Sequence, residues 1–114
     1  MDEVCFALPL LPGKTDDAKA FMEELEGTRK GDYAASERRI GIVKESWYLQ
    51  RTPNGDLFVA YMESPDFAKA LESFSRSSDD FDQWFKRRLA EVTGITLNDP
   101  PPGPLSEQVS SYQA

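Results

Sequence analysis

The feature that most constrains the fold of this chain is a hairpin-like stretch, ESWYLQRTPNGDLFVAYME, at residues 45–63. Two runs rich in β-branched and aromatic side chains flank a Pro-Asn-Gly segment, which is typical of two antiparallel strands joined by a tight turn. The first run places Ser46, Tyr48 and Gln50 on one face of its strand, where a simple core would need apolar side chains. These three residues, the mixed face, are therefore expected to lie outside the core of a single chain.

The turn of this hairpin decides which residues lie opposite one another. Pro53 suits the first central position of a type I turn, and Gly55 suits the left-handed residue of a three-residue loop with a bulge. A two-residue Asn-Gly loop is the competing interpretation. We prefer the three-residue loop because it uses Pro53, and in this register Glu45 lies directly opposite Glu63.

Further strands and amphipathic helices are predicted on both sides of the hairpin. The expected order is a strand over 3–8, a helix from Thr15 to about Gly27, a short helix over about 33–40 with Tyr33 and Ile40 pointing inward, strands over about 43–51 and 57–63, a helix that starts at Ser64 and Pro65, a helix over 79–93 ended by Gly94, and a short strand at 95–97. Right-handed crossovers turn this order into a ferredoxin-like split βαβ sandwich, an α+β fold in which helices cover one face of an antiparallel sheet.

The C-terminal stretch differs in composition from the rest of the chain. It begins with NDPPPGPL, and prolines lack the backbone donor that a sheet or helix needs. We therefore expect one domain over 1–97 and an extended, polyproline-like tail over 98–114. The tail is expected either to lie along a partner subunit or to be mobile.

Composition excludes several classes of function. The chain has 114 residues and a net charge of −7. Nucleic-acid binding depends on Lys and Arg releasing counterions from phosphates, so an acidic domain is a poor candidate for it, and equally poor for anionic membrane surfaces. No signal-peptide pattern is present, and no apolar run approaches the roughly 20 residues that span a bilayer. We expect a cytoplasmic protein without nucleic-acid or membrane partners.

Histidine is absent, and Cys5 is the only cysteine. These absences exclude Ser-His and Cys-His nucleophilic catalysis, His-ligated haem, the usual zinc and copper sites, and any disulfide within the chain. We therefore expect no cofactor and no metal site.

The mixed face is the best candidate for a binding surface. Trp47 and Leu49 alternate with it and are expected to pack beneath the helices. In the preferred register Phe58 and Met62 join the mixed face. Packing this surface against a second copy of the chain would bury its apolar part and enclose its polar groups, or a small molecule, between the two sheets. The predicted ligand-binding residues are Ser46, Tyr48, Gln50, Phe58 and Met62.

Two carboxylates are the only weak catalytic candidates. Glu45 and Glu63 repel each other if they lie opposite, so one of them would hold a proton near neutral pH and act as an acid or a base. The simpler interpretation is that Lys44, Arg38 or Arg39 neutralises them, or that the strand ends splay apart.

Three blocks of sequence carry a resemblance to a known superfamily. They are KESWYLQRTPNGDLFVAYME at 44–63, SDDFDQWFKRRL at 78–89 and GITLNDPPPGPL at 94–105. With them the chain resembles the dimeric α+β barrel superfamily and, more narrowly, a bacterial family of small proteins of unknown function. The resemblance implies a homodimer that packs sheet on sheet. It implies no reaction, and the haem-binding histidine of some superfamily members has no counterpart here.

Three functional hypotheses follow. The first is a homodimer that binds a small apolar or aromatic molecule between its two sheets. The second is a cofactor-independent monooxygenase or isomerase that acts on an aromatic or polyketide-like compound, with Tyr48, Gln50 and Glu45 positioning the substrate and moving protons. The third is an interaction protein with a dry dimer interface.

Overall fold

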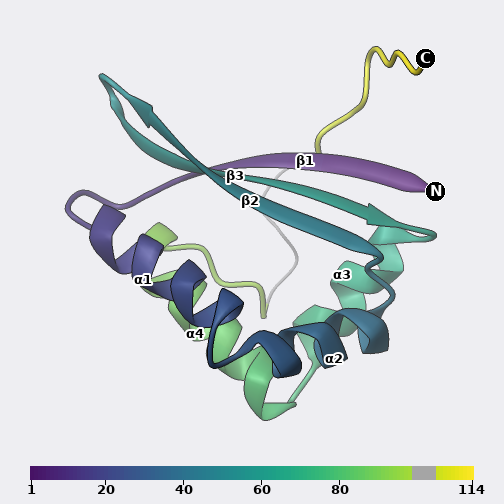
Figure 1. Ribbon diagram of the computed structural model, residues 1–114, viewed down its shortest axis with the longest axis horizontal. Coiled ribbons are helices and arrows are strands. Elements are labelled where there is room, and N and C mark those ends of the chain that lie inside the picture. Colours follow the sequence, from purple (N-terminus) through teal and green to yellow (C-terminus); the bar gives the residue numbers. More distant parts are fainter. Residues whose placement is uncertain (99–104) are drawn as a thin grey trace.

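The computed structural model describes residues 1–98 and 105–114 as a single antiparallel sheet covered by helices. The elements, in chain order, are β1 (Asp2–Pro9), α1 (Thr15–Glu26), α2 (Lys30–Ile40), β2 (Lys44–Thr52), β3 (Gly55–Ser64), α3 (Phe67–Arg76) and α4 (Asp80–Thr93). The strands have the order β1-β3-β2, and Figure 1 shows all four helices on one side of them. The expected α+β class, with helices on one face of the sheet, is confirmed. No helix in the described residues is long and apolar enough to cross a membrane.

The predicted fourth strand at 95–97 is wrong. Helix α4 ends where expected, at Gly94, whose φ of 75° is left-handed and favours glycine. The backbone N–H of Ile95 then donates to Oγ1 of Thr93 over 3.1 Å, so the chain turns back on the helix end and does not run along the sheet. Strand β1 therefore lies at one edge of the sheet.

Helix α3 also begins later than expected. The predicted capping residue, Ser64, is buried, and its hydroxyl donates to the backbone oxygen of Gly41 over 2.8 Å. Asp66 is the cap, because its side chain accepts a 3.1 Å hydrogen bond from the backbone N–H of Lys69.

The loop of the hairpin is neither of the two predicted loops, and the register of its strands differs accordingly. Thr52 pairs with Gly55, so the loop has only Pro53 and Asn54 at its centre. The hydroxyl of Thr52 favours this shorter loop, because it accepts a hydrogen bond from the backbone N–H of Asn54 and donates to the backbone oxygen of Gly55. Along the whole hairpin the pairing is shifted by one residue from the preferred register.

Because side chains alternate along a strand, this shift places every side chain of β3 on the face of the sheet opposite to the predicted one. Phe58 and Met62 point toward the helices and do not join the mixed face, so that prediction is wrong. Phe58 is buried in the core. The face of the sheet away from the helices, the open face, instead combines the mixed face with alternate residues of β3. Its β3 residues are Leu57, Val59, Tyr61 and Glu63.

The core lies between the sheet and the helices and is rich in aromatic rings. Phe85 of α4 is at its centre, with ring centroids 5.1 Å from Phe21, 5.5 Å from Phe74 and 6.0 Å from Trp47. Phe21 has no exposed surface. Replacing such a residue with Ala typically costs about 3–5 kcal/mol. This aromatic layer fixes the distance between the sheet and the helices.

A buried carboxylate ties α2 to α4. Asp82 has no exposed surface and accepts hydrogen bonds of 2.5 Å from Ser36, 2.5 Å from Ser77 and 2.8 Å from Arg39. Burial alone would raise the pKa of Asp82, but these three donors together lower it from its ordinary value. Helix α2 is therefore held in a fixed position, and the site described next depends on that position.

Candidate functional site

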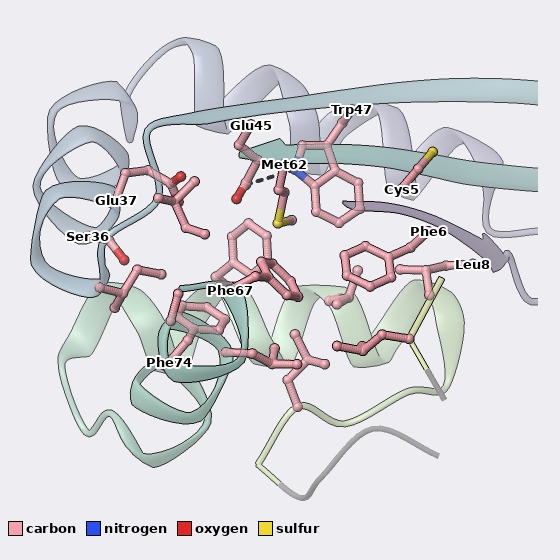
Figure 2. Close-up of a pocket in the computed structure, with 18 of the residues that line it drawn as sticks. Cys5, Phe6, Leu8, Ser36, Glu37, Glu45, Trp47, Met62, Phe67 and Phe74 are labelled. Carbon is pink, nitrogen blue, oxygen red and sulfur yellow. Dashed lines mark hydrogen bonds between the residues drawn. The ribbon is translucent and has the colours of Figure 1, made fainter. Parts of the chain in front are cut away.

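A cavity of about 350 Å³ lies between the sheet and the helices that cover it (Figure 2). Most of its wall is apolar and comes from β1, β3 and α3. The main apolar residues are Phe6, Leu8, Met62, Phe67, Leu71 and Phe74. Both the volume and the apolar wall are typical of a site for a small organic molecule.

The polar groups of the cavity gather around one carboxylate, that of Glu45. The indole Nε1 of Trp47 donates a 2.9 Å hydrogen bond to Oε2 of Glu45, and the hydroxyl of Tyr33 donates to the same oxygen. Glu37 hydrogen-bonds to Glu45 from α2. Figure 2 shows Glu37 pointing from its helix toward Glu45, with the Trp47 bond drawn dashed. The cavity therefore has one polar end and an otherwise apolar wall.

The surroundings of the two carboxyl groups raise the pKa of both. Burial raises the pKa of Glu37 to about 9, and the nearby charge of Glu45 adds to the effect. Burial also raises the pKa of Glu45, although the bonds from Trp47, Tyr33 and Glu37 oppose this shift by stabilising its ionised form. Of the two carboxyl groups, Glu37 therefore holds its proton more strongly, because the donors around Glu45 stabilise the ionised form of Glu45.

Tyr33 remains a donor throughout this range, because burial and the charge of Glu45 raise the pKa of its hydroxyl. Glu45 thus receives hydrogen bonds from three donors while it is ionised. This arrangement separates an acid, Glu37, from a base, Glu45, inside a single cavity.

Local sequence patterns place these groups. Glu45 and Trp47 are two positions apart on β2, so both point toward the helices. Tyr33, Glu37 and Ile40 follow the i, i+4, i+7 spacing of one helical stripe on α2, and all three line the cavity. Sequence reasoning predicted that Tyr33 and Ile40 point inward but missed Glu37. The stripe spacing was the signal that could have found it.

The predicted pairing of Glu45 with Glu63 is wrong. Glu45 lies opposite Met62 and faces the cavity, whereas Glu63 lies on the open face and pairs with Lys44 and Glu3 across the strands. The hydroxyl of Tyr61 donates a 2.8 Å hydrogen bond to Glu63. The carboxyl pair expected within the hairpin is instead formed between Glu45 and α2.

The other predicted ligand-binding residues divide between the two faces of the sheet. Met62 lines the cavity. Ser46, Tyr48 and Gln50 lie on the open face, where Tyr48 is 59% exposed and Nε2 of Gln50 donates to the backbone oxygen of Arg51. Their role in ligand binding remains a prediction, because it requires a second chain.

Segment 105–114 also reaches the cavity. Leu105 and Ser106 contribute to its wall beside β1. The backbone N–H of Cys5 donates a 3.1 Å hydrogen bond to Oγ of Ser106, which ties this segment to the edge of the sheet. Among residues 1–98 and 105–114, no three His, Cys, Asp or Glu side chains lie close enough together to hold a metal ion.

The fold and the site define a small ferredoxin-like α+β protein with a cavity beneath its sheet. More particularly, the chain belongs to a family described as "Family of unknown function (DUF6176)", which matches residues 1–100. None of the curated proteins matches the chain.

Two solved structures share the fold at low sequence identity. L-rhamnose mutarotase FA22100 from Formosa agariphila is 12% identical, with a TM-score of 0.61, over 99% of this chain and 100% of that protein. Tetracenomycin F2 cyclase from Streptomyces glaucescens, a type-II polyketide cyclase, is 17% identical, with a TM-score of 0.59, over 100% of this chain and 99% of that protein. At these identities the similarity concerns the fold alone.

Proposed function

We propose that this protein binds a small, neutral, largely apolar molecule in the cavity and moves protons on it through Glu37 and Glu45. The observation that carries this proposal is the pair of carboxyl groups, Glu37 and Glu45, at the polar end of an apolar cavity, with Tyr33 and Trp47 donating to Glu45. Placing two half-buried carboxyl groups side by side destabilises a fold, and a chain that only needed a core would gain by replacing them with apolar residues. The pair therefore favours an acid–base role over passive packing.

The composition of the wall indicates the charge of the ligand. Lys and Arg are absent from the described residues that line the cavity. An anionic ligand would meet the charge of Glu45 with nothing to offset it. A neutral molecule with one carbonyl or hydroxyl group fits better, because its polar atom can bond to Glu37 or Tyr33 while its apolar part contacts the aromatic wall.

The chemistry that such a pair supports is the movement of a proton within one substrate. The carboxylate of Glu45 takes a proton from a carbon beside the carbonyl, and the carboxyl of Glu37 gives its proton to the carbonyl oxygen, which yields an enol. Where a carbon–carbon double bond is conjugated with the enol, reversal of both transfers with the proton returned to the far end of the conjugated system gives an isomer and restores both side chains. The isomerisation leaves the oxidation state of the substrate unchanged, so the reaction requires no oxidant.

The names of the two structural relatives are compatible with this class of reaction. One is a mutarotase and the other a cyclase. Both names denote rearrangement of bonds within one substrate, which an acid and a base can promote. Of the enzymatic alternatives raised by the sequence, an isomerase is therefore favoured over a monooxygenase.

A second copy of the chain is proposed to cover the open face. Tyr48 is largely exposed there, beside the partly exposed Leu57, Val59 and Tyr61. An exposed group of large apolar side chains commonly marks an interface. The resemblance to dimeric α+β barrels supports packing of one sheet on the other. In that dimer Ser46 and Gln50 would face the partner, so the cavity and the dimer interface would lie on opposite sides of the sheet.

Binding of a neutral fluorescent dye, N-phenyl-1-naphthylamine, tests the proposed cavity. Ala70 is buried in α3 and lines the cavity, whereas Ala68 is exposed on the same helix. We expect one dye per chain for the native protein and for Ala68→Phe, and loss of binding for Ala70→Phe, because the added ring fills the space. Equal binding by both variants would remove the cavity as the ligand site.

A further inference from the structure

The segment that follows the proline-rich stretch runs along the outer edge of β1. Ser106 accepts a hydrogen bond from the backbone of Cys5, and Nε2 of Gln108 donates to Oε2 of Glu3 over 3.3 Å. As the residue numbers of the segment increase, those of β1 decrease, so the two run antiparallel. Residues 105–108 thus lie beside β1 at the edge of the sheet.

Beyond Gln108 the chain leaves its own domain. Figure 1 shows the C-terminal segment rising from β1 on the side of the sheet away from the helices. Val109 is 88% exposed and Tyr112 is 90% exposed. Two large apolar side chains in so short an extended segment gain little burial from their own chain, and the segment itself lies on the side of the sheet on which a second subunit would pack.

We propose that residues 109–114 of each chain, the C-terminal arm, pack against a second copy of this chain, with Val109 and Tyr112 as the contacting side chains. This inference rests on the homodimer of the proposed function. It specifies which part of the chain would hold the two copies together, and it connects that contact to the cavity.

The lack of charged side chains in the C-terminal arm favours a second copy of this chain as its partner. Its sequence, VSSYQA, contains no charged side chain, although the chain as a whole carries a net charge of −7. Two acidic chains repel each other, and an arm without charged side chains can cross between them without adding side-chain charge to that repulsion. A basic partner protein, by contrast, would be better recognised by acidic residues, which this arm lacks.

The same segment connects the partner to the cavity. Ser106 lines the cavity, and Val109 follows only three positions later. An extended chain covers about 10 Å in three residues, so a contact that fixes Val109 also restricts Ser106 and Leu105. Binding of the partner is therefore expected to complete the cavity wall, and loss of the arm is expected to weaken dimerisation and ligand binding together.

Two variants test the arm in the full-length protein. The double substitution Val109→Ser and Tyr112→Ser removes the apolar contacts and keeps the length, and a stop after Gln108 removes the arm but keeps both cavity-lining residues. The matched control is Ser110→Ala with Ser111→Ala in the same segment. The measurements are the dimer dissociation constant by sedimentation equilibrium and the affinity for N-phenyl-1-naphthylamine.

We expect both arm variants to raise the dimer dissociation constant by about tenfold or more and to weaken dye binding at concentrations where the variants are monomeric, with the control unchanged. An unchanged dissociation constant in both variants would overturn the inference. Weaker dye binding with unchanged dimerisation would also overturn it, because the arm would then pack on its own chain.

The outcomes for the native protein separate this inference from the proposed function. A native monomer that binds one dye would overturn the dimer and the arm but leave the cavity in place. A native dimer that binds no dye would contradict the cavity, and the arm would still be judged by its effect on the dissociation constant.

Discussion

The indole Nε1 of Trp47 donates a 2.9 Å hydrogen bond to the carboxylate of Glu45, two positions earlier on the same face of β2. The hydroxyl of Tyr33 donates to the same oxygen. Both bonds favour the ionised form of Glu45, so of the two half-buried carboxyl groups Glu37 holds its proton more strongly. Glu37 is thus the proposed acid of the site, and Glu45 is the proposed base.

Glu45→Gln removes the proposed base while keeping its shape. We expect the protein to accelerate deuterium incorporation beside the carbonyl of 1-tetralone, a small neutral aromatic ketone, in heavy water. The substitution should reduce this acceleration by about 100-fold or more, which is typical for loss of a general base. Glu63→Gln, on the open face, is the matched control. Proton NMR measures the exchange, and equal rates for the two variants would contradict the role of Glu45.

The raised pKa of Glu37 also makes stability depend on pH. The folded state holds a proton on Glu37 up to a pKa of about 9, whereas the ordinary value is 4.5, so the folded state binds more protons than the unfolded state between these limits. The free energy of unfolding must therefore fall as pH rises through this window, by at most about 1.4 kcal/mol per pH unit and by less where solvent screens the group.

Glu37→Gln should make this decline smaller, because an amide does not titrate, and the raised pKa of Glu45 accounts for the decline that remains. Urea unfolding at pH 6 and pH 8 measures it, with Glu26→Gln at an exposed position of α1 as the control. A native protein equally stable at both pH values would show that Glu37 does not hold the proton.

Asp82→Asn should destabilise the fold by about 2–4 kcal/mol, because the buried carboxylate loses its charge opposite Arg39 and its strongest hydrogen bonds. The pKa of Asp82 is lowered in the folded state, so its contribution is present above the ordinary carboxyl range and is lost as pH falls below it. The difference between native protein and variant should therefore shrink in acid.

Denaturant unfolding measures the effect, and Asp80→Asn in the first turn of α4 is the control, with an expected loss below about 1 kcal/mol. Equal losses in the two variants would show that the Asp82 network does not hold α2 in place.

Tyr48→Arg tests the proposed dimer independently of the arm. A charged side chain at the most exposed aromatic position of the open face should raise the dimer dissociation constant by about tenfold or more. Ala68→Arg on α3 adds the same charge away from that face and should leave it unchanged. Sedimentation equilibrium distinguishes the two, and a Tyr48→Arg dimer as tight as the native one would place the interface elsewhere.

Much of the fold was predictable from local sequence patterns. Gly94 ends α4 as expected, and Trp47 faces the helices while Tyr48 faces away. These features depend on the alternation of side chains along a single strand or on the backbone conformation of a single glycine. They need no knowledge of which segments meet in space.

The register of the hairpin was not predictable in the same way. The apolar residues of β3 give no preference, because Leu57, Val59 and Tyr61 on one face are as suitable for a core as Phe58 and Met62 on the other. The turn residues fit several loops, and the hydrogen bonds of Thr52 that favour the shorter one are visible only in three dimensions. This one-residue shift also moved Phe58 and Met62 away from the predicted site.

The helical spacing on α2 could have placed Glu37 toward the cavity, but its role as the proposed acid was not predictable from the sequence. Glu37 stands in a polar run, SERR, that is typical of a solvated helix face. Its pKa depends on Glu45, which lies eight residues away across the turn between α2 and β2. Only the packing of that helix beneath the sheet brings the two carboxyl groups together.

The most direct test of the central claim is a carbon-13 NMR titration of the Glu37 side-chain carboxyl, assigned by comparison with Glu37→Gln. We expect this carboxyl to remain protonated at neutral pH and to titrate with a pKa of about 9. A titration near 4.5, the ordinary value for a glutamate, would contradict the raised pKa of Glu37 and the acid–base function built on it.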